Sequence, residues 1–375
     1  MIAGVFAMVL PIDPKRFVQH VGSWLECTGP ESDVVISCRM RLARNVQGYP
    51  FVLRLEDPKA RELGNRVREV LLAQRIDGET IWIGMEEASP LVKLLLRERY
   101  LISRDLAPND PRLAARPGRG VAFGENERLA VMVNEEDHLR LQSLSSGYSL
   151  REAFARVRDL DLALEKELPF AVDSRLGYLT GCPTNVGTGL RASVMLHLPA
   201  LGLVRSELSK AINAAQRTGL AVRGMYGEGS RAAGDFYQVS NQVTLGSSEE
   251  ELIGELEELV PCIVAFERRV RELLGSQQRG ALEDRVQRSY GMLRTARSLA
   301  TDVALMHLSN VRLGVLLGLV AGIKLPELAR IAVQIQKGHV HFLVGEGGSA
   351  LSQEATERDR QRAAFLRRRF AESAS

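Results

Sequence analysis

Cysteine is scarce in this sequence of 375 residues, and no two cysteines stand in a Cys-x-x-Cys pair. Zinc sites and disulfide frameworks need clustered or regularly spaced cysteines, so neither class of protein is indicated. Few and scattered cysteines are typical of a reducing compartment, and we expect a cytoplasmic protein. The four cysteines are Cys27, Cys38, Cys182 and Cys262.

Long apolar runs and an excess of one charge are also missing. No apolar run reaches the ~18 residues needed to span a bilayer. Residues 1–10 are apolar but lack a basic segment and a cleavage site; they form either a first strand or a leader to a true start at Met8. The net charge of +3 gives no general attraction to nucleic acid or membranes, and we expect neither as a partner.

The order of apolar patterns predicts an α+β protein with an antiparallel sheet flanked by helices. Strand-like segments at 33–41, 80–85, 129–133, 193–198, 219–225 and 236–245 come mostly as neighbours, not as regular βαβ units. Residues 109–124 are rich in Pro, Gly and Arg and predict a loop. After about residue 248 the patterns are helical only, which predicts a catalytic domain over 1–250 and a helical domain over 251–375.

The most distinctive stretch is the glycine-rich loop at residues 181–195. It contains Cys182, several small polar residues and Arg191, whose planar guanidinium suits phosphate or carboxylate. Residues 187–192 fit the GxGxxG/A pattern, but a turn precedes them and a strand-like run follows them. We therefore reject a dinucleotide-binding motif, which must follow a strand and open a helix. A simple turn between strands is the alternative for this loop alone.

Charged residues gather after other strands as well. Five arginines stand at such places, and like charges brought together require an anion to neutralise them. A nucleoside triphosphate with Mg²⁺ would do so, because phosphoryl transfer depends on positioning and charge stabilisation. Neither a Walker A sequence nor the HRD and DFG motifs of protein kinases is present. The arginines are Arg39, Arg41, Arg140, Arg191 and Arg223.

Four strings together resemble the ATP:guanidino phosphotransferases, over about residues 30–255. They are SCRMR at 37–41, NEEDHLR at 134–140, CPTNVGT at 182–188 and RGMYGE at 223–228. Within that family the chain is similar to the bacterial enzymes that phosphorylate arginine in proteins. Few residues precede Ser37, which leaves no room for the helical domain that grips small guanidino metabolites, and a helical extension follows instead.

The resemblance implies roles for residues at matching positions. Glu136 and Glu228 would align the acceptor guanidinium and take its proton, and Cys182 would lie beside it. A free guanidinium has a pKa of roughly 13.8, so the proton must leave as the new bond forms. Tyr100 stands where relatives usually have histidine, and it could stack on the nucleotide or donate to it. The implied ATP-binding residues are Ser37, Cys38, Arg39, Met40, Arg41, Arg140, Arg191, Ala192, Ser193, Val194, Met195, Arg223, Gly224 and Glu228.

The last helical segment carries the string RDRQRA at 358–363. Arg358 and Arg362 share a helix face, and the string matches the motif with which those relatives bind phosphoarginine as an allosteric signal. A solvated charged tail is the alternative. The implied pocket residues are Arg358, Asp359, Arg362 and Ala363. The resemblance also implies protein substrates with exposed arginines, an activator protein, a Clp-type unfoldase and a homodimer.

Two other functions stay open at this stage. One is a metabolite kinase for free arginine or a related compound, against which the short N-terminal part argues. The other is an inactive protein that only binds phosphoarginine, against which the intact Glu136, Glu228 and Cys182 argue. Comparing phosphorylation of a protein with phosphorylation of free arginine distinguishes a protein kinase from a metabolite kinase. An ATP-consumption assay distinguishes an active enzyme from an inactive binding protein.

Overall fold

The computed structural model describes residues 12–108, 110, 116–224, 233–344 and 354–372. Its described part contains one eight-stranded sheet in the order β2-β3-β4-β5-β1-β8-β10-β9, in which all neighbours are antiparallel. The strands are β1 (Val35–Arg44), β2 (Thr80–Gly84), β3 (Gly120–Gly124), β4 (Leu129–Val133), β5 (Leu139–Ser146), β8 (Leu190–His197), β9 (Ala221–Gly224) and β10 (Phe236–Ser240). A separate hairpin pairs β6 (Val172–Asp173) with β7 (Gly177–Tyr178). This confirms the predicted α+β sheet with flanking helices.

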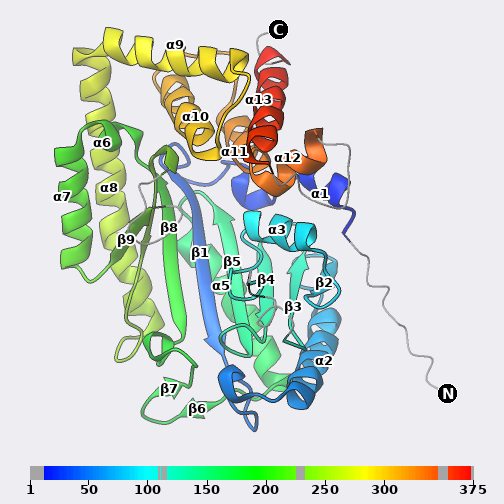
Figure 1. Ribbon diagram of the computed structural model, residues 1–375. Helices are drawn as coiled ribbons and strands as arrows, with labels where there is room; N and C mark the ends of the chain where they lie inside the picture. The colour runs from blue at the N-terminus through cyan, green and yellow to red at the C-terminus, as the bar shows by residue number, and fades with distance from the viewer. Residues whose placement is uncertain (1–11, 109, 111–115, 225–232, 345–353, 373–375) are drawn as a thin grey trace.

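Three long helices share one hydrophobic core with the sheet, and α5 covers its rear face in Figure 1. Each is amphipathic: the apolar stripe of α5 packs on β1 and β5, that of α8 on β8, and that of α2 on β2 and β3. Ser248 and Glu251 form a capping box that fixes the start of α8. The helices are α2 (Asp57–Gln74), α5 (Leu150–Glu167) and α8 (Glu249–Gln277), and α7 (Arg205–Arg217) packs against β9.

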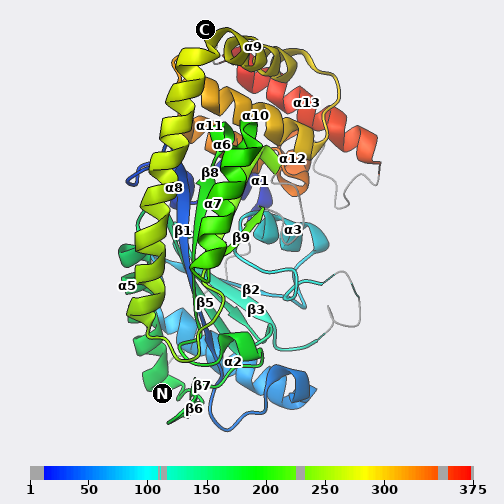
Figure 2. The same cartoon turned by 90° about the vertical axis from the view of Figure 1, so that its left-hand side faces the viewer.

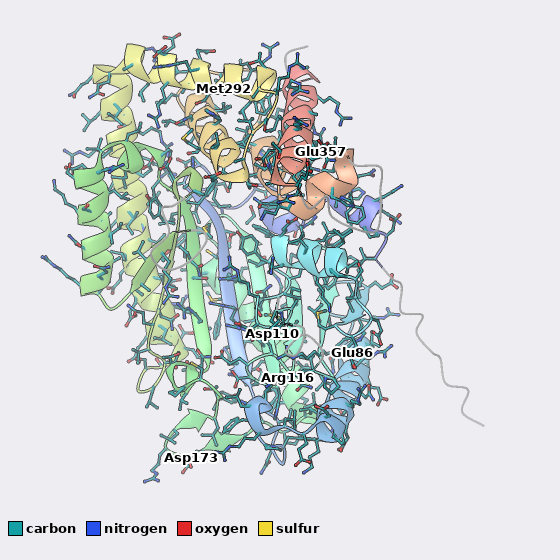
Figure 3. The ribbon with its side chains drawn as sticks, in the orientation of Figure 1. Glu86, Asp110, Arg116, Asp173, Met292 and Glu357 are labelled. Carbon is teal, nitrogen blue, oxygen red and sulfur yellow. The ribbon has the colours of Figure 1, made fainter. Side chains whose placement is uncertain are left out.

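The later helices form a second unit at one end of the sheet (Figures 1 and 2). They have their own core, built mainly from residues 293–370. In Figure 3, Met292 and Glu357 mark this end of the molecule, and Asp173 on the β6–β7 hairpin marks the other. The helices are α9 (Arg279–Thr295), α10 (Thr301–Leu316), α11 (Leu325–Gln334), α12 (Lys337–Val344) and α13 (Ala355–Glu372).

The helical unit is anchored to the sheet part through α3 (Pro90–Glu98). The Glu98 carboxylate accepts hydrogen bonds from the backbone N–H groups of Gly338 and His339 and faces the His339 ring nitrogen at 2.8 Å. A carboxylate at a helix N-terminus is favourable because unpaired N–H groups point at it. Helix α12 also packs on α1 (Pro14–Gln19), so the first helix of the chain contacts the helical unit.

Two local predictions were wrong. The expected loop at 109–124 ends in strand β3, whose five residues are all buried. Gly120 is required there because a Cβ would lie 2.3 Å from the Trp82 ring, so this glycine marks close packing, not a turn. The periodic pattern over residues 281–310 also predicts one continuous helix, but the structure has two, with a break at residues 296–300. No helix of the described part is long and apolar enough to cross a membrane.

Candidate active site

Strand β1 places three predicted site residues on one face of the sheet. Side chains alternate along a strand, so Ser37, Arg39 and Arg41 face a cavity of about 980 Å³. Cys38 and Met40 face the opposite way and are buried in the hydrophobic core. The same alternation puts Ser193 and Met195 of β8 in the cavity, and Ala192 and Val194 in the core.

The arginines come together because their strands are neighbours in register. Arg41 of β1 pairs directly with Arg191 of β8, and Ala43, two residues on, pairs with Arg140 of β5. Arg39 and Arg223 of β9 line the same cavity. Strands β5, β1 and β8 are adjacent and β9 lies one strand further on, beyond β10, and together these four strands supply five guanidinium groups to one space.

The electrostatics of this row favour an anionic ligand. Burial lowers the pKa of Arg39 to about 10, and the positive charges of Arg140 and Arg191 add to this effect. Burial and the same two arginines also lower the pKa of Arg41 well below its usual range. The Nε of Arg41 is buried without a hydrogen-bond partner. A bound polyphosphate would relieve the repulsion and supply acceptors to these donors. Within the described part, no group of three or more His, Cys, Asp or Glu side chains could hold a metal ion.

The β4–β5 turn presents the candidate base Glu136. Burial by itself would raise the pKa of Glu135. Its carboxylate is bound to Arg140 at 2.7 Å, however, and this contact holds the pKa of Glu135 below its ordinary value. Glu136 is exposed, unlike its neighbours in the turn, but the partial desolvation of its carboxyl group raises its pKa despite the attraction of Arg140. A carboxylate that is less occupied by partners than its neighbour is better suited to take a proton from a substrate.

The turn and the Cys182 loop are tied together through Asp137. Its carboxylate accepts from the Gly181 backbone N–H and from Asn45 Nδ2, both at 2.6 Å. The Cys182 thiol interacts with the Glu136 carboxylate and lowers its pKa slightly against the effect of desolvation. Cys182 Sγ also lies 3.1 Å from Thr184 Oγ1. The structure therefore places Glu136 and Cys182 next to each other.

Glu228 lies outside the described residues, whereas Gly224 lines the cavity. The tail residues Arg358, Asp359 and Arg362 line the same cavity from helix α13, at the end formed by the helical unit. Ala363 is fully buried in the core of that unit.

The sequence-based set misses many residues that line the cavity, among them Gln238, Trp24 and Leu25. Gln238 of β10 accepts from Arg39 Nη2 at 3.5 Å, and Trp24 and Leu25 enter from the N-terminal part. Gln238 could have been found from the alternation of β10, because every second residue of that strand faces the cavity. Nothing in the sequence alone brings residues 24 and 25 to this cavity.

Comparison with known proteins accounts for this arrangement. Residues 62–270 match the model of the ATP:guanido phosphotransferase C-terminal catalytic domain. The chain belongs to the ATP:guanido phosphotransferase family. Its residues 279–375 match the C-terminal domain of the protein-arginine kinase McsB.

Relatives of this family match along nearly the whole chain. The chain is 41% identical to a protein-arginine kinase of Bacillus subtilis over 95% of both chains. It is 44% identical to one of Moorella thermoacetica, over 93% of this chain and 97% of that one.

Among solved structures, lombricine kinase has a TM-score of 0.56 at 26% identity, over 67% of this chain and 70% of that one. The duplicated taurocyamine kinase of Schistosoma mansoni, with bound transition-state-analogue components, has a TM-score of 0.57 at 27% identity. That match covers 70% of this chain and 39% of the other.

Proposed function

We propose that this chain is an ATP-dependent protein-arginine kinase, which transfers the γ-phosphoryl group of ATP to arginine side chains of proteins. The observation that carries the proposal is one cavity lined by five arginines, together with a carboxylate–thiol pair, Glu136 and Cys182, that lies near Arg140 but does not itself line the cavity. The names of the full-length relatives and the match of the helical unit support a protein, not a metabolite, as acceptor.

In the proposed reaction an acceptor guanidinium nitrogen attacks the γ-phosphorus. The N–P bond forms, the bond from phosphorus to the β,γ-bridging oxygen breaks, and the electron pair leaves with ADP. Glu136 aligns the nitrogen and accepts its proton, with Glu228 as the second carboxylate and Cys182 beside the guanidinium.

The arginine row would hold the phosphates and stabilise charge on the leaving group. Mg²⁺ enters with ATP as part of the substrate. Because Mg²⁺ keeps several waters and binds mainly through substrate phosphates, it requires no dedicated cage of side chains.

The test is mass spectrometry of an arginine-rich, unfolded protein incubated with the chain and MgATP, under conditions that preserve acid-labile phosphoarginine. We expect a mass increase on arginine residues. Phosphorylation of free arginine in preference to protein would instead indicate a metabolite kinase. ATP consumption that stays at background would indicate a binding protein without activity.

Arg191→Ala is expected to weaken ATP binding by about tenfold or more, because a charge-assisted contact to a phosphate is lost. Within the protein, the Arg191 guanidinium donates a hydrogen bond to the Ser240 hydroxyl at 3.2 Å. Calorimetric titration with ATP measures the change. Arg217→Ala, at the exposed end of α7, is the matched control and should bind as the parent does. Equal affinity of both variants would contradict the clamp.

We also propose that Arg358, Asp359, Arg362 and Ala363 belong to a phosphoarginine site. Arg358→Ala should abolish stimulation by added phosphoarginine and leave basal activity unchanged, because the residue is at the helical end of the cavity. Arg360→Ala is the control, since that exposed side chain points away from the cavity lining. Activity assays with and without phosphoarginine measure the effect. The same response in both variants would contradict the site.

The remaining proposals concern organisation. The core around the sheet includes α8 as far as Leu274, and we propose that the helical unit begins after α8, later than the boundary at residue 251 suggested by composition. Exposed Met292, Val303 and Met306 on α9 and α10 support a homodimer through the helical unit. A cytoplasmic location, an activator protein and delivery of products to a Clp-type protease complete the proposal.

A further inference from the structure

Asn45, the residue that directly follows β1, lies where three segments of the chain meet beside the carboxylate–thiol pair. Only 2% of its surface is exposed. Its side-chain amide contacts the β4–β5 turn, which carries Glu136, and the segment that leads into Cys182. None of the four strings that mark the site in the sequence includes Asn45, so its place in the structure is the first sign of a role.

Every polar atom of the Asn45 amide has a partner. The Nδ2 group donates to Asp137 Oδ1 at 2.6 Å and to the Leu179 carbonyl at 3.0 Å. The Oδ1 atom accepts from the His138 backbone N–H at 3.0 Å. These partners fix the orientation of the amide, because half a turn would set acceptor against acceptor and donor against donor. Asn45 therefore uses both of its N–H donors to join the turn to the segment before Cys182.

The Asp137 carboxylate extends this connection to the Cys182 loop. The Oδ1 atom that accepts from Asn45 also accepts from the Gly181 backbone N–H, at 2.6 Å. Burial raises the pKa of Asp137, whereas these two hydrogen bonds favour its charged form, which is the stronger acceptor. The backbones of turn and loop are also close, since a Cβ on Gly181 would lie 2.9 Å from the Glu136 carbonyl oxygen. Glycine permits this approach because it has no Cβ.

We propose that Asn45 is a positioning residue for phosphoryl transfer, which holds Asp137 against Gly181. Glu136 directly precedes Asp137 in the chain, and the residue after Gly181 is the thiol of the pair. The contact that Asn45 maintains therefore sets the separation of the carboxylate and the thiol. The inference rests on the proposed function, because the pair acts on the acceptor guanidinium in that reaction. A misplacement of about 1 Å in such a pair can cost about 10²-fold in rate.

The arginines of the cavity are held independently of Asn45. Arg39, Arg41 and Arg191 stand within β1 and β8, where the ladder between the two strands fixes their register. Loss of the Asn45 contacts should therefore lower kcat and leave nucleotide affinity unchanged. A residue that only stabilises the fold would give a different result, since its loss would change stability without changing kcat for each folded molecule.

Asn45→Asp is the sharpest test, because it keeps the shape of the side chain and replaces the donating NH₂ group with an acceptor that faces Asp137. We expect kcat for phosphoarginine formation on a protein to fall about tenfold or more, and ADP affinity by calorimetry to stay within about twofold. The number of ADP sites in the same titration gives the concentration of folded enzyme. Asn310→Ala, which removes another buried and hydrogen-bonded amide in α10, is the matched control. It should lower stability in urea and leave kcat unchanged.

Two further variants test the same contact without a new buried charge. Gly181→Ala would press its Cβ against the Glu136 carbonyl oxygen, so it should also lower kcat and leave ADP affinity unchanged. Asn45→Ala should lower kcat about tenfold in the parent but less than about threefold in Glu136→Gln, because a residue that acts through Glu136 has little to position once the carboxylate is gone.

A kcat of Asn45→Asp equal to that of the parent would overturn the inference. Equal losses of kcat from Asn45→Ala in the parent and in Glu136→Gln would also overturn it, and so would an ADP affinity that falls as far as kcat does. A parent that forms no phosphoarginine would mean instead that the proposed function fails.

Discussion

Glu136→Gln is expected to lower kcat by about 10²-fold or more and to leave ATP affinity unchanged. The amide keeps the size of the side chain and its contact distance to Cys182, but it carries no negative charge and cannot accept the guanidinium proton. Turnover is measured by phosphoarginine formation on a protein substrate, and ATP affinity by calorimetry. Glu272→Gln, which removes an exposed carboxylate on α8, is the matched control.

The same assignment predicts a pH dependence. Partial desolvation raises the pKa of Glu136, and a protonated carboxyl cannot accept a proton from the substrate. As the pH falls, kcat of the parent should therefore begin to drop at a higher pH than an ordinary glutamate would give. A Glu136→Gln enzyme that turns over like the parent, or a parent kcat that is flat down to the ordinary range of glutamate, would refute the role of Glu136.

Arg362→Ala is expected to lower the free energy of unfolding by about 3 kcal/mol. This loss of stability is much larger than the loss expected from alanine substitutions of the neighbouring arginines on α13. The buried guanidinium of Arg362 donates to the Leu299 and Ile335 carbonyls and to Asp359 Oδ1. These bonds join α13 to the α9–α10 break and to the end of α11. Each lost hydrogen bond costs about 1 kcal/mol, and the buried carbonyls are left without a donor.

Urea unfolding of Arg362→Ala and Arg358→Ala measures this difference. Arg360→Ala serves as the control for a mutation on the exposed face of α13, where changes are usually within about 0.5 kcal/mol. If Arg362→Ala is as stable as Arg360→Ala, the guanidinium does not hold the unit together. The result also decides how the experiments on stimulation by phosphoarginine are interpreted. If Arg362→Ala is destabilised, only Arg358→Ala tests phosphoarginine binding without a loss of stability.

The general plan of the sheet could be predicted because its strands are apolar and lie between clear turns. Strand β4 was predicted at its observed bounds, since it has one strong apolar pattern and sharp end signals. Strand β3 was missed because buried glycines imitate a loop. Strand β5 was not predicted, because it begins within the charged NEEDHLR string. The acidic part of that string is a tight turn, which is held by hydrogen bonds of Asn134, Glu135 and Asp137.

The residues of the candidate site could be predicted only where they lie in or next to a recognisable sequence motif. Arg39 lies in the SCRMR string and Arg191 follows the CPTNVGT string in the same glycine-rich stretch, and the register of β1 and β8 explains why they meet. Trp24 and α11 could not be assigned to the cavity, because contacts between segments 300 residues apart depend on how the helical unit docks. The Glu98 contact with the start of α12 fixes that docking, and a glutamate in an amphipathic helix gives no sign of it.

The arginine row and the tail arginine Arg358 line one continuous cavity, although they come from opposite ends of the chain. Thermodynamic linkage makes any influence between two ligands in such a space reciprocal. If phosphoarginine near Arg358 changes the affinity for ATP, then ATP must change the affinity for phosphoarginine by the same factor. Sensitivity to phosphorylated product would therefore be set by the nucleotide supply, and the enzyme would respond to both quantities as a single signal.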